Sequence, residues 1–149
     1  MEILDINFNV DDTENIVKDS RYACDEAIKN AEEDIAEYNE YIKFEWTKIG
    51  RPFKRLEIEE SVQVAMHAFD NLNKSIDFLV TLFQSRESFI RQNNSQDQIQ
   101  SSYKLRQEVL GISKNIAKYN RLKQLYKQKR IKLLEMANGL SDQNQPENY

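Results

Sequence analysis

Glycine and proline are scarce in this chain: only 3 Gly and 2 Pro occur among its 149 residues. A β-sandwich or an α/β domain needs frequent turns, and turns depend on these two residue types. The scarcity therefore excludes a fold of many short elements and favours a few long helices. Because this length is close to the commonest domain size, we expect a single domain.

Histidine and cysteine occur once each, at His67 and Cys24. One cysteine cannot form an internal disulfide, and one histidine cannot supply the ligand spacing of a zinc or di-iron site. The glycines form no phosphate-binding loop. We interpret Cys24 as a buried core residue, and His67 as a side chain that is either solvated or hydrogen-bonded within the fold, not as a ligand. We therefore predict a protein that is not an enzyme and has no metal, cofactor or catalytic residue.

Long apolar runs are also absent. Residues 78–80 form one of the longest, whereas a helix needs about 20 apolar residues to cross a bilayer. The N-terminal residues are acidic where a secretory signal is basic and then apolar. We expect a cytoplasmic protein without a membrane span.

The chain does contain a repeated apolar pattern with the seven-residue period of a coiled coil. Apolar residues recur at alternating steps of three and four, which predicts helices over about 12–49, 56–93 and 97–138. The positions in this repeat, here called the seams, are Val17, Cys24, Ile28, Ala31, Ile35, Tyr38, Ile42 and Ile49; Ile58, Val62, Ala65, Phe69, Leu72, Ile76, Leu79, Phe83 and Ile90; and Leu105, Val109, Ile112, Ile116, Tyr119, Tyr126, Leu133 and Ala137.

Local signals mark the predicted helix ends. Asp11 with Glu14 resembles a capping box and predicts the start of the first helix. Gly50 followed by Pro52 predicts its end, and Gly139 predicts the end of the third helix.

Short links between long helices predict an all-α fold in which neighbouring helices are antiparallel. We expect residues 11–140 to form an elongated up-down-up three-helix bundle, followed by a disordered tail over 141–149. Residues 1–10 alternate between apolar and polar, which predicts an extended arm. Such an arm lies along the bundle in the favoured interpretation, or adds a strand to a partner's sheet in the other.

Charge is unevenly distributed along the chain. Residues 1–60 hold 17 acidic and 8 basic side chains, whereas residues 101–149 hold 4 acidic and 10 basic ones. Up-down-up threading predicts that Glu45 and Arg130 share one layer. It also places the acidic residues within 32–40 beside the basic residues within 114–123. We therefore interpret most of the asymmetry as pairing within the bundle, not as a binding surface.

We predict a non-enzymatic protein–protein interaction module: a helical adaptor, a chaperone-like protein or a regulatory subunit that can also form a homodimer. Apolar residues outside the seams, at the hairpin end and in the arm are candidates for partner contacts. They are Leu4, Ile6, Phe8, Trp46, Phe53, Phe78, Leu82 and Phe89.

The alternative is a nucleic-acid-binding protein that uses the basic face of the third helix. Basic side chains neutralise phosphates, but Tyr119 and Tyr126 occupy the seam, so we do not expect them to stack on bases. The candidate residues are Lys114, Lys118, Arg121, Lys123, Lys127, Lys129, Arg130 and Lys132.

Overall fold

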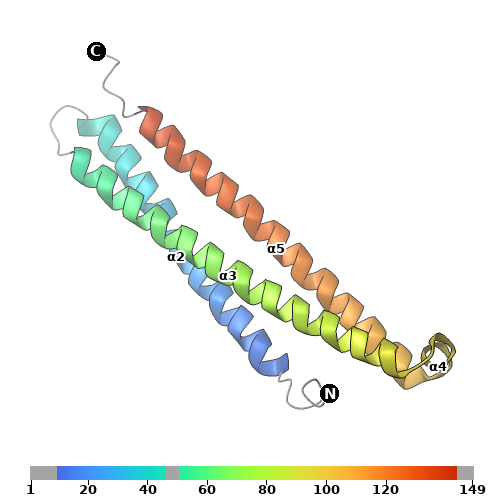
Figure 1. Cartoon of the computed structure of the whole chain (residues 1–149). Coiled ribbons are helices and arrows are strands. Elements are labelled where there is room, and N and C mark those ends of the chain that lie inside the picture. The colour runs from blue at the N-terminus through green and yellow to red at the C-terminus, as the bar shows by residue number, and fades with distance from the viewer. Residues whose placement is uncertain (1–9, 46–50, 144–149) are drawn as a thin grey trace. The chain divides into compact units, whose positions relative to one another are not determined.

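The structure is a computed structural model that describes the backbone of residues 10–45 and 51–143 and the side chains of 13–40 and 57–139. The described residues form helices and no strand, which confirms the all-α class (Figure 1). The helices are α2 (Val10–Glu45), α3 (Arg51–Asn93), α4 (Gln96–Ser101) and α5 (Tyr103–Gln143).

The chain folds into two compact units, and each of the three long helices contributes one segment to each unit. Unit 1 consists of residues 1–18 and 73–125, and unit 2 consists of residues 19–72 and 126–149. Each unit has a core of its own. The arrangement of residues 11–140 as one up-down-up bundle stays a prediction.

The seam pattern decides which side chains are buried, because a helix that touches its neighbours along one stripe buries only that stripe. Among the residues whose side chains are described, every buried apolar residue except Ala27 and Ile99 is a predicted seam position. The core of unit 1 contains Val17, Ile76, Leu79, Phe83, Ile90, Ile99, Ile112 and Tyr119. The core of unit 2 contains Cys24, Ala27, Ile28, Ala31, Ile35, Tyr38, Ile58, Val62, Ala65, Phe69, Leu72, Tyr126 and Leu133.

Three predicted helix ends are wrong. Asp11 lies inside the first turn of α2 and does not cap it. The next helix begins at Arg51, with Pro52 in its first turn, where the missing N–H of proline has no helical acceptor to lose. The last helix continues past Gly139 to Gln143. A glycine ends a helix by taking a positive φ, and none of the described glycines does so.

The predicted helix over 97–138 is divided in two at Ser102. Ser95 caps α4 through a capping box: the Gln98 N–H donates to Ser95 Oγ at 3.1 Å, and the Ser95 N–H donates to Gln98 Oε1 at 2.6 Å. Ser102 has an extended backbone and ends α4, and its Oγ accepts a hydrogen bond from the Leu105 N–H at 3.3 Å. Two serine caps thus turn the chain from α3 into α5.

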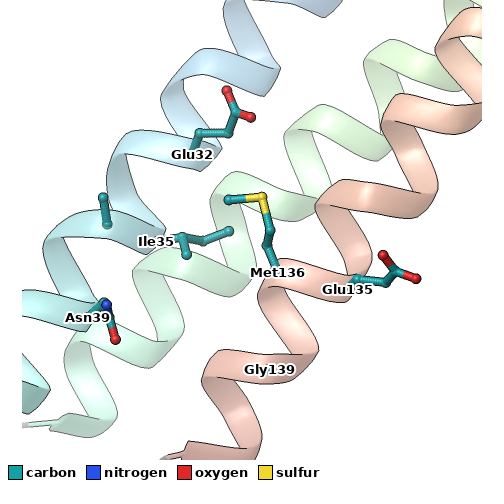
Figure 2. Close-up of a pocket in the computed structure, with 7 residues that line it drawn as sticks. Glu32, Ile35, Asn39, Glu135, Met136 and Gly139 are labelled. Atoms are coloured by element: carbon teal, nitrogen blue, oxygen red, sulfur yellow. The ribbon is translucent and has the colours of Figure 1, made fainter.

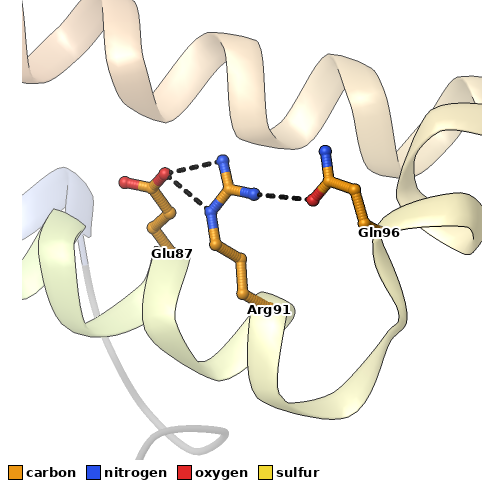
Figure 3. A network of polar contacts seen from close by, with 3 residues as sticks. All are labelled: Glu87, Arg91 and Gln96. Carbon is orange, nitrogen blue, oxygen red and sulfur yellow. Dashed lines mark hydrogen bonds and ion pairs between the residues drawn. The ribbon is translucent and has the colours of Figure 1, made fainter.

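Arg91 joins the end of α3 to the start of α4 (Figure 3). Its Nε lies 3.0 Å from Glu87 Oε2, and its Nη1 lies 3.4 Å from Gln96 Oε1. Exposed pairs of this kind stabilise by about 0–1 kcal/mol. The buried Ile99 adds an apolar contact that fixes α4 on unit 1.

Candidate interaction surfaces

A buried tyrosine joins the three helix segments of unit 2. Tyr126 of α5 meets Phe69 of α3 edge-on, with ring centroids 6.2 Å apart and planes at 65°. Its hydroxyl donates to Asp25 Oδ1 of α2 at 2.7 Å. Lys129 Nζ lies 4.8 Å from the Tyr126 ring centroid and 3.7 Å from the same Asp25 oxygen. Burial, and then the hydrogen bond to Asp25, raise the pKa of Tyr126, so this side chain stays protonated and positions helices.

Cys24 is fully buried beside this tyrosine layer. Burial raises the pKa of its thiol to about 12; Asp25 adds to the shift, and Lys129 acts in the opposite direction. Since the thiolate is the nucleophilic form, this cysteine is chemically inert at neutral pH. His67 is exposed, and the described residues contain no cluster of three His, Cys, Asp or Glu side chains placed to hold a metal ion.

Unit 1 contains a second tyrosine layer. Tyr119 of α5 stacks on Phe83 of α3, with centroids 6.4 Å apart and planes at 19°. Its hydroxyl donates to Glu14 Oε1 of α2 at 2.8 Å. Lys118 Nζ lies 5.1 Å from the ring centroid. Both tyrosines are therefore buried structural residues, and neither ring is available for stacking on a nucleic-acid base.

The predicted pairing of the acidic residues within 32–40 with the basic residues within 114–123 is wrong. In unit 2, Asp34 accepts a hydrogen bond from the Ser61 hydroxyl, and Glu32 lines a pocket together with Glu135. In unit 1, Lys123 Nζ pairs with Asp77 Oδ1 of α3 at 2.6 Å. Internal pairing of the two segments therefore does not explain the charge asymmetry.

The predicted layer of Glu45 and Arg130 is wrong for the same reason. Arg130 follows Lys129, which is level with Asp25 of α2. Glu45 lies on the order of 30 Å further along that helix, at 1.5 Å per residue. The predicted alignment has the second helix beginning after Pro52 and has no helix corresponding to α4. Both differences move the residues of α5 in the same direction relative to those of α2.

The basic residues of α5 differ in their contacts. Lys123 and Lys129 take part in ion pairs. The other six residues of the predicted nucleic-acid-binding set make no ion pair with any residue whose side chain is described: Lys114, Lys118 and Arg121 in unit 1, and Lys127, Arg130 and Lys132 in unit 2.

Three of the predicted contact residues, Phe78, Leu82 and Phe89, form an apolar stripe along α3 in unit 1, and this stripe is partly exposed. Phe78 is 55% exposed, and Leu82 and Phe89 are half-buried. The remaining predicted contact residues lie outside the side chains that the structure describes: Leu4, Ile6, Phe8, Trp46 and Phe53. Exposed apolar residues that the prediction did not include are Ile16, Tyr22, Val64, Tyr103, Leu110, Leu125 and Ile131.

A pocket of about 330 Å³ lies between α2 and α5 within unit 2 (Figure 2). Small residues on both helices, Ala36 and Gly139, leave this space. It is lined by Glu32, Ile35, Ala36 and Asn39 of α2 and by Glu135, Met136 and Gly139 of α5. Sequence reasoning missed the pocket, because the residues of α2 and α5 that line it come together only in the observed register.

No protein-family model matches this chain, and no curated protein or solved structure matches it either. Within residues 10–45 and 51–143, no helix is long and apolar enough to span a membrane.

Proposed function

We propose that this chain is a non-enzymatic protein–protein interaction module that binds a partner protein through exposed helix faces. The observation that carries the proposal is the apolar stripe on α3 in unit 1, where Phe78 is 55% exposed beside the half-buried Leu82 and Phe89. Aromatic side chains are enriched in interfaces, because burying one removes a large apolar area from water. A helical adaptor, a chaperone-like protein or a regulatory subunit would use such a stripe, and so would a homodimer.

The buried polar groups support a structural role for the rest of the molecule. Cys24 and Tyr126 both have raised pKa values and stay protonated, so neither supplies a nucleophile or a base near neutral pH. The contacts of Tyr126 with Asp25 of α2 and Phe69 of α3 instead hold the helices of unit 2 together.

Photo-crosslinking tests the stripe directly. A benzophenone amino acid replaces Phe78 in the full chain, and the matched control carries it at Gln84, an exposed position on a different face of α3. We expect a discrete crosslinked product from position 78 alone, either with a partner in the native host or with a second copy in the purified protein. Equal crosslinking from both positions, or none from position 78, would contradict the proposal.

Nucleic-acid binding is the second candidate function. It is supported by six of the eight predicted basic residues, which form no ion pair with any residue whose side chain is described: Lys114, Lys118, Arg121, Lys127, Arg130 and Lys132. Binding through phosphates falls steeply with salt concentration. Fluorescence anisotropy with labelled single-stranded and duplex DNA measures this dependence, and the absence of binding at low ionic strength would remove the candidate.

A further inference from the structure

The pocket in unit 2 has an apolar floor and an acidic rim. Ile35 of α2 and Met136 of α5 point toward each other across it, and Glu32 extends from α2 beside them (Figure 2). The carboxylate of Glu135 lies on the side of α5 away from Ile35, so Glu32 is the nearer charge for a guest. Among the side chains of 13–40 and 57–139, no basic one lines the pocket.

This lining fits a long side chain with an apolar stem and a cationic head. Lysine and arginine cover apolar surface with their methylene groups while the charged head stays close to water. Glu32 and Glu135 are both exposed, and neither pairs with another described residue, so each can accept hydrogen bonds from a guest. Met136 can adjust to the shape of the guest, because an unbranched thioether side chain adopts many conformations.

The charge of unit 2 favours the same kind of guest. Its residues include 16 acidic and 11 basic side chains, whereas those of unit 1 include 9 acidic and 10 basic ones. Lys29 and Lys132 are exposed one turn away from the pocket and lie outside its lining. A negative surface attracts a basic segment and orients its approach.

We propose that this pocket receives a lysine or arginine side chain from a basic helical segment of a partner protein. The proposal rests on the proposed function in one respect, that the ligand is a protein. It concerns a surface of unit 2, while the Phe78 stripe belongs to unit 1, so the two are tested separately.

Filling the pocket tests the proposal without disturbing the fold. An added Cβ at Gly139 meets no atom within 4 Å, and its φ is not positive, so Gly139→Leu places a side chain in open space. Leucine also favours a helix more than glycine does. Gly111→Leu is the matched control, because Gly111 lies on the same helix in unit 1 and also has nothing within 4 Å.

The probe is a fluorescent alanine-based helical peptide with an arginine in every heptad. A control peptide of the same length has glutamine at those positions. By anisotropy we expect the arginine peptide to bind at least about tenfold more tightly than the glutamine peptide. We expect Gly139→Leu to lower its affinity about tenfold, Glu32→Gln about fivefold, and Gly111→Leu less than about twofold. Circular dichroism verifies that each variant keeps its helix content.

Equal binding of the arginine peptide by wild type, Gly139→Leu and Glu32→Gln would overturn the proposal, since general charge attraction would then be sufficient. So would absence of binding at low ionic strength. A dimer of the unliganded chain that Gly139→Leu dissociates would also overturn it and would identify a second copy as the occupant. If Gly139→Leu and Glu32→Gln leave the affinity unchanged while position 78 still crosslinks, this proposal fails and the proposed function does not.

Discussion

The two units join their helices with the same device in two different geometries. In each unit a tyrosine of α5 contacts a phenylalanine of α3 and donates its hydroxyl to an acid of α2. The rings of Phe83 and Tyr119 in unit 1 are stacked at 19°, whereas those of Phe69 and Tyr126 in unit 2 meet at 65°. Both geometries satisfy a buried phenol, so what the units share is the connection and not a fixed ring arrangement.

The electrostatic surroundings of the two tyrosines differ more than their packing does. Asp25 of unit 2 accepts from Tyr126, lies 3.7 Å from Lys129, and raises the pKa of Cys24. In unit 1, Lys123 pairs with Asp77 of α3, on a different helix from the acid that Tyr119 uses. In unit 2, therefore, one carboxylate is shared by the buried phenol, the buried thiol and a lysine, whereas in unit 1 the tyrosine and the lysine use different acids.

The largest expected effect comes from removing the phenylalanine of either layer. Phe69 and Phe83 are 2% and 4% exposed, so Phe69→Ala and Phe83→Ala should each lower the free energy of unfolding by about 3–5 kcal/mol through lost burial and a cavity. Urea denaturation measures the loss. Phe78→Ala, at a 55% exposed position, is the control and should cost less than about 1 kcal/mol. A small loss for only one of the buried pair would break the equivalence of the layers.

The second prediction concerns alkaline pH and unit 2. Cys24 has its pKa raised from 9.0 to about 12, and that of Tyr126 is raised above its usual 10.0. The folded state therefore keeps protons that the unfolded state releases, and this stability is complete below pH 9 and is lost as pH rises toward 12. We expect the free energy of unfolding to fall by about 1.4 kcal/mol per pH unit for each group that is titrating.

Cys24→Ala isolates the thiol contribution in that experiment. The variant should show a decline that begins near pH 10, where the phenol of Tyr126 starts to ionise in the unfolded chain, and not near pH 9. Urea titrations at several pH values between 8 and 10.5 compare the two onsets. Identical curves for wild type and variant would mean that unit 2 is not coupled to this thiol.

The third prediction compares the two hydroxyls. Tyr126→Phe and Tyr119→Phe keep the ring and remove one hydrogen bond each, to Asp25 and to Glu14. Hydrogen bonds to charged acceptors stabilise by about 1.5–3 kcal/mol, but both acids are at least partly exposed and can recover water, so we expect a loss of about 1 kcal/mol for each variant. Thermal or urea unfolding measures the loss. Neutral behaviour of both variants would show that the hydroxyls do not join the helices.

The buried seam could be predicted from the sequence, and the register between helices could not. Core positions such as Ile76 and Leu79 could be predicted because the seven-residue apolar repeat places them on the one stripe of the helix that packs against its neighbours. The register between helices depends on the residue at which each connection falls. The predicted connections differ from the observed ones at Pro52 and between α3 and α5. Pro52 is compatible with a first helical turn as well as with a break, and the caps at Ser95 and Ser102 were not recognised.

The pocket depended on that register. Ala36 and Gly139 are small residues on different helices, and only the observed offset brings them to opposite sides of one space. Phe78, in contrast, could be identified without register, because the heptad period alone places it outside the seam of α3, and it is 55% exposed.

The smallest expected effects come from the two lysine–aspartate pairs. Lys123 lies 2.6 Å from Asp77 and Lys129 lies 3.7 Å from Asp25, and all four side chains are between 36% and 59% exposed. Each of Lys123→Gln and Lys129→Gln should therefore change the free energy of unfolding by about 0–1 kcal/mol, and salt should reduce the change further.

The two lysine variants should differ from each other at alkaline pH. Lys129 lowers the pKa of Cys24, so its removal raises that pKa further, and Lys129→Gln extends the alkaline decline to higher pH whereas Lys123→Gln does not. Urea titrations of both variants between about pH 10 and 12, where the folded-state thiol begins to ionise, measure this difference at low and high salt. Matching profiles for the two lysine variants would remove the electrostatic distinction between the units and leave only the ring geometry to separate them.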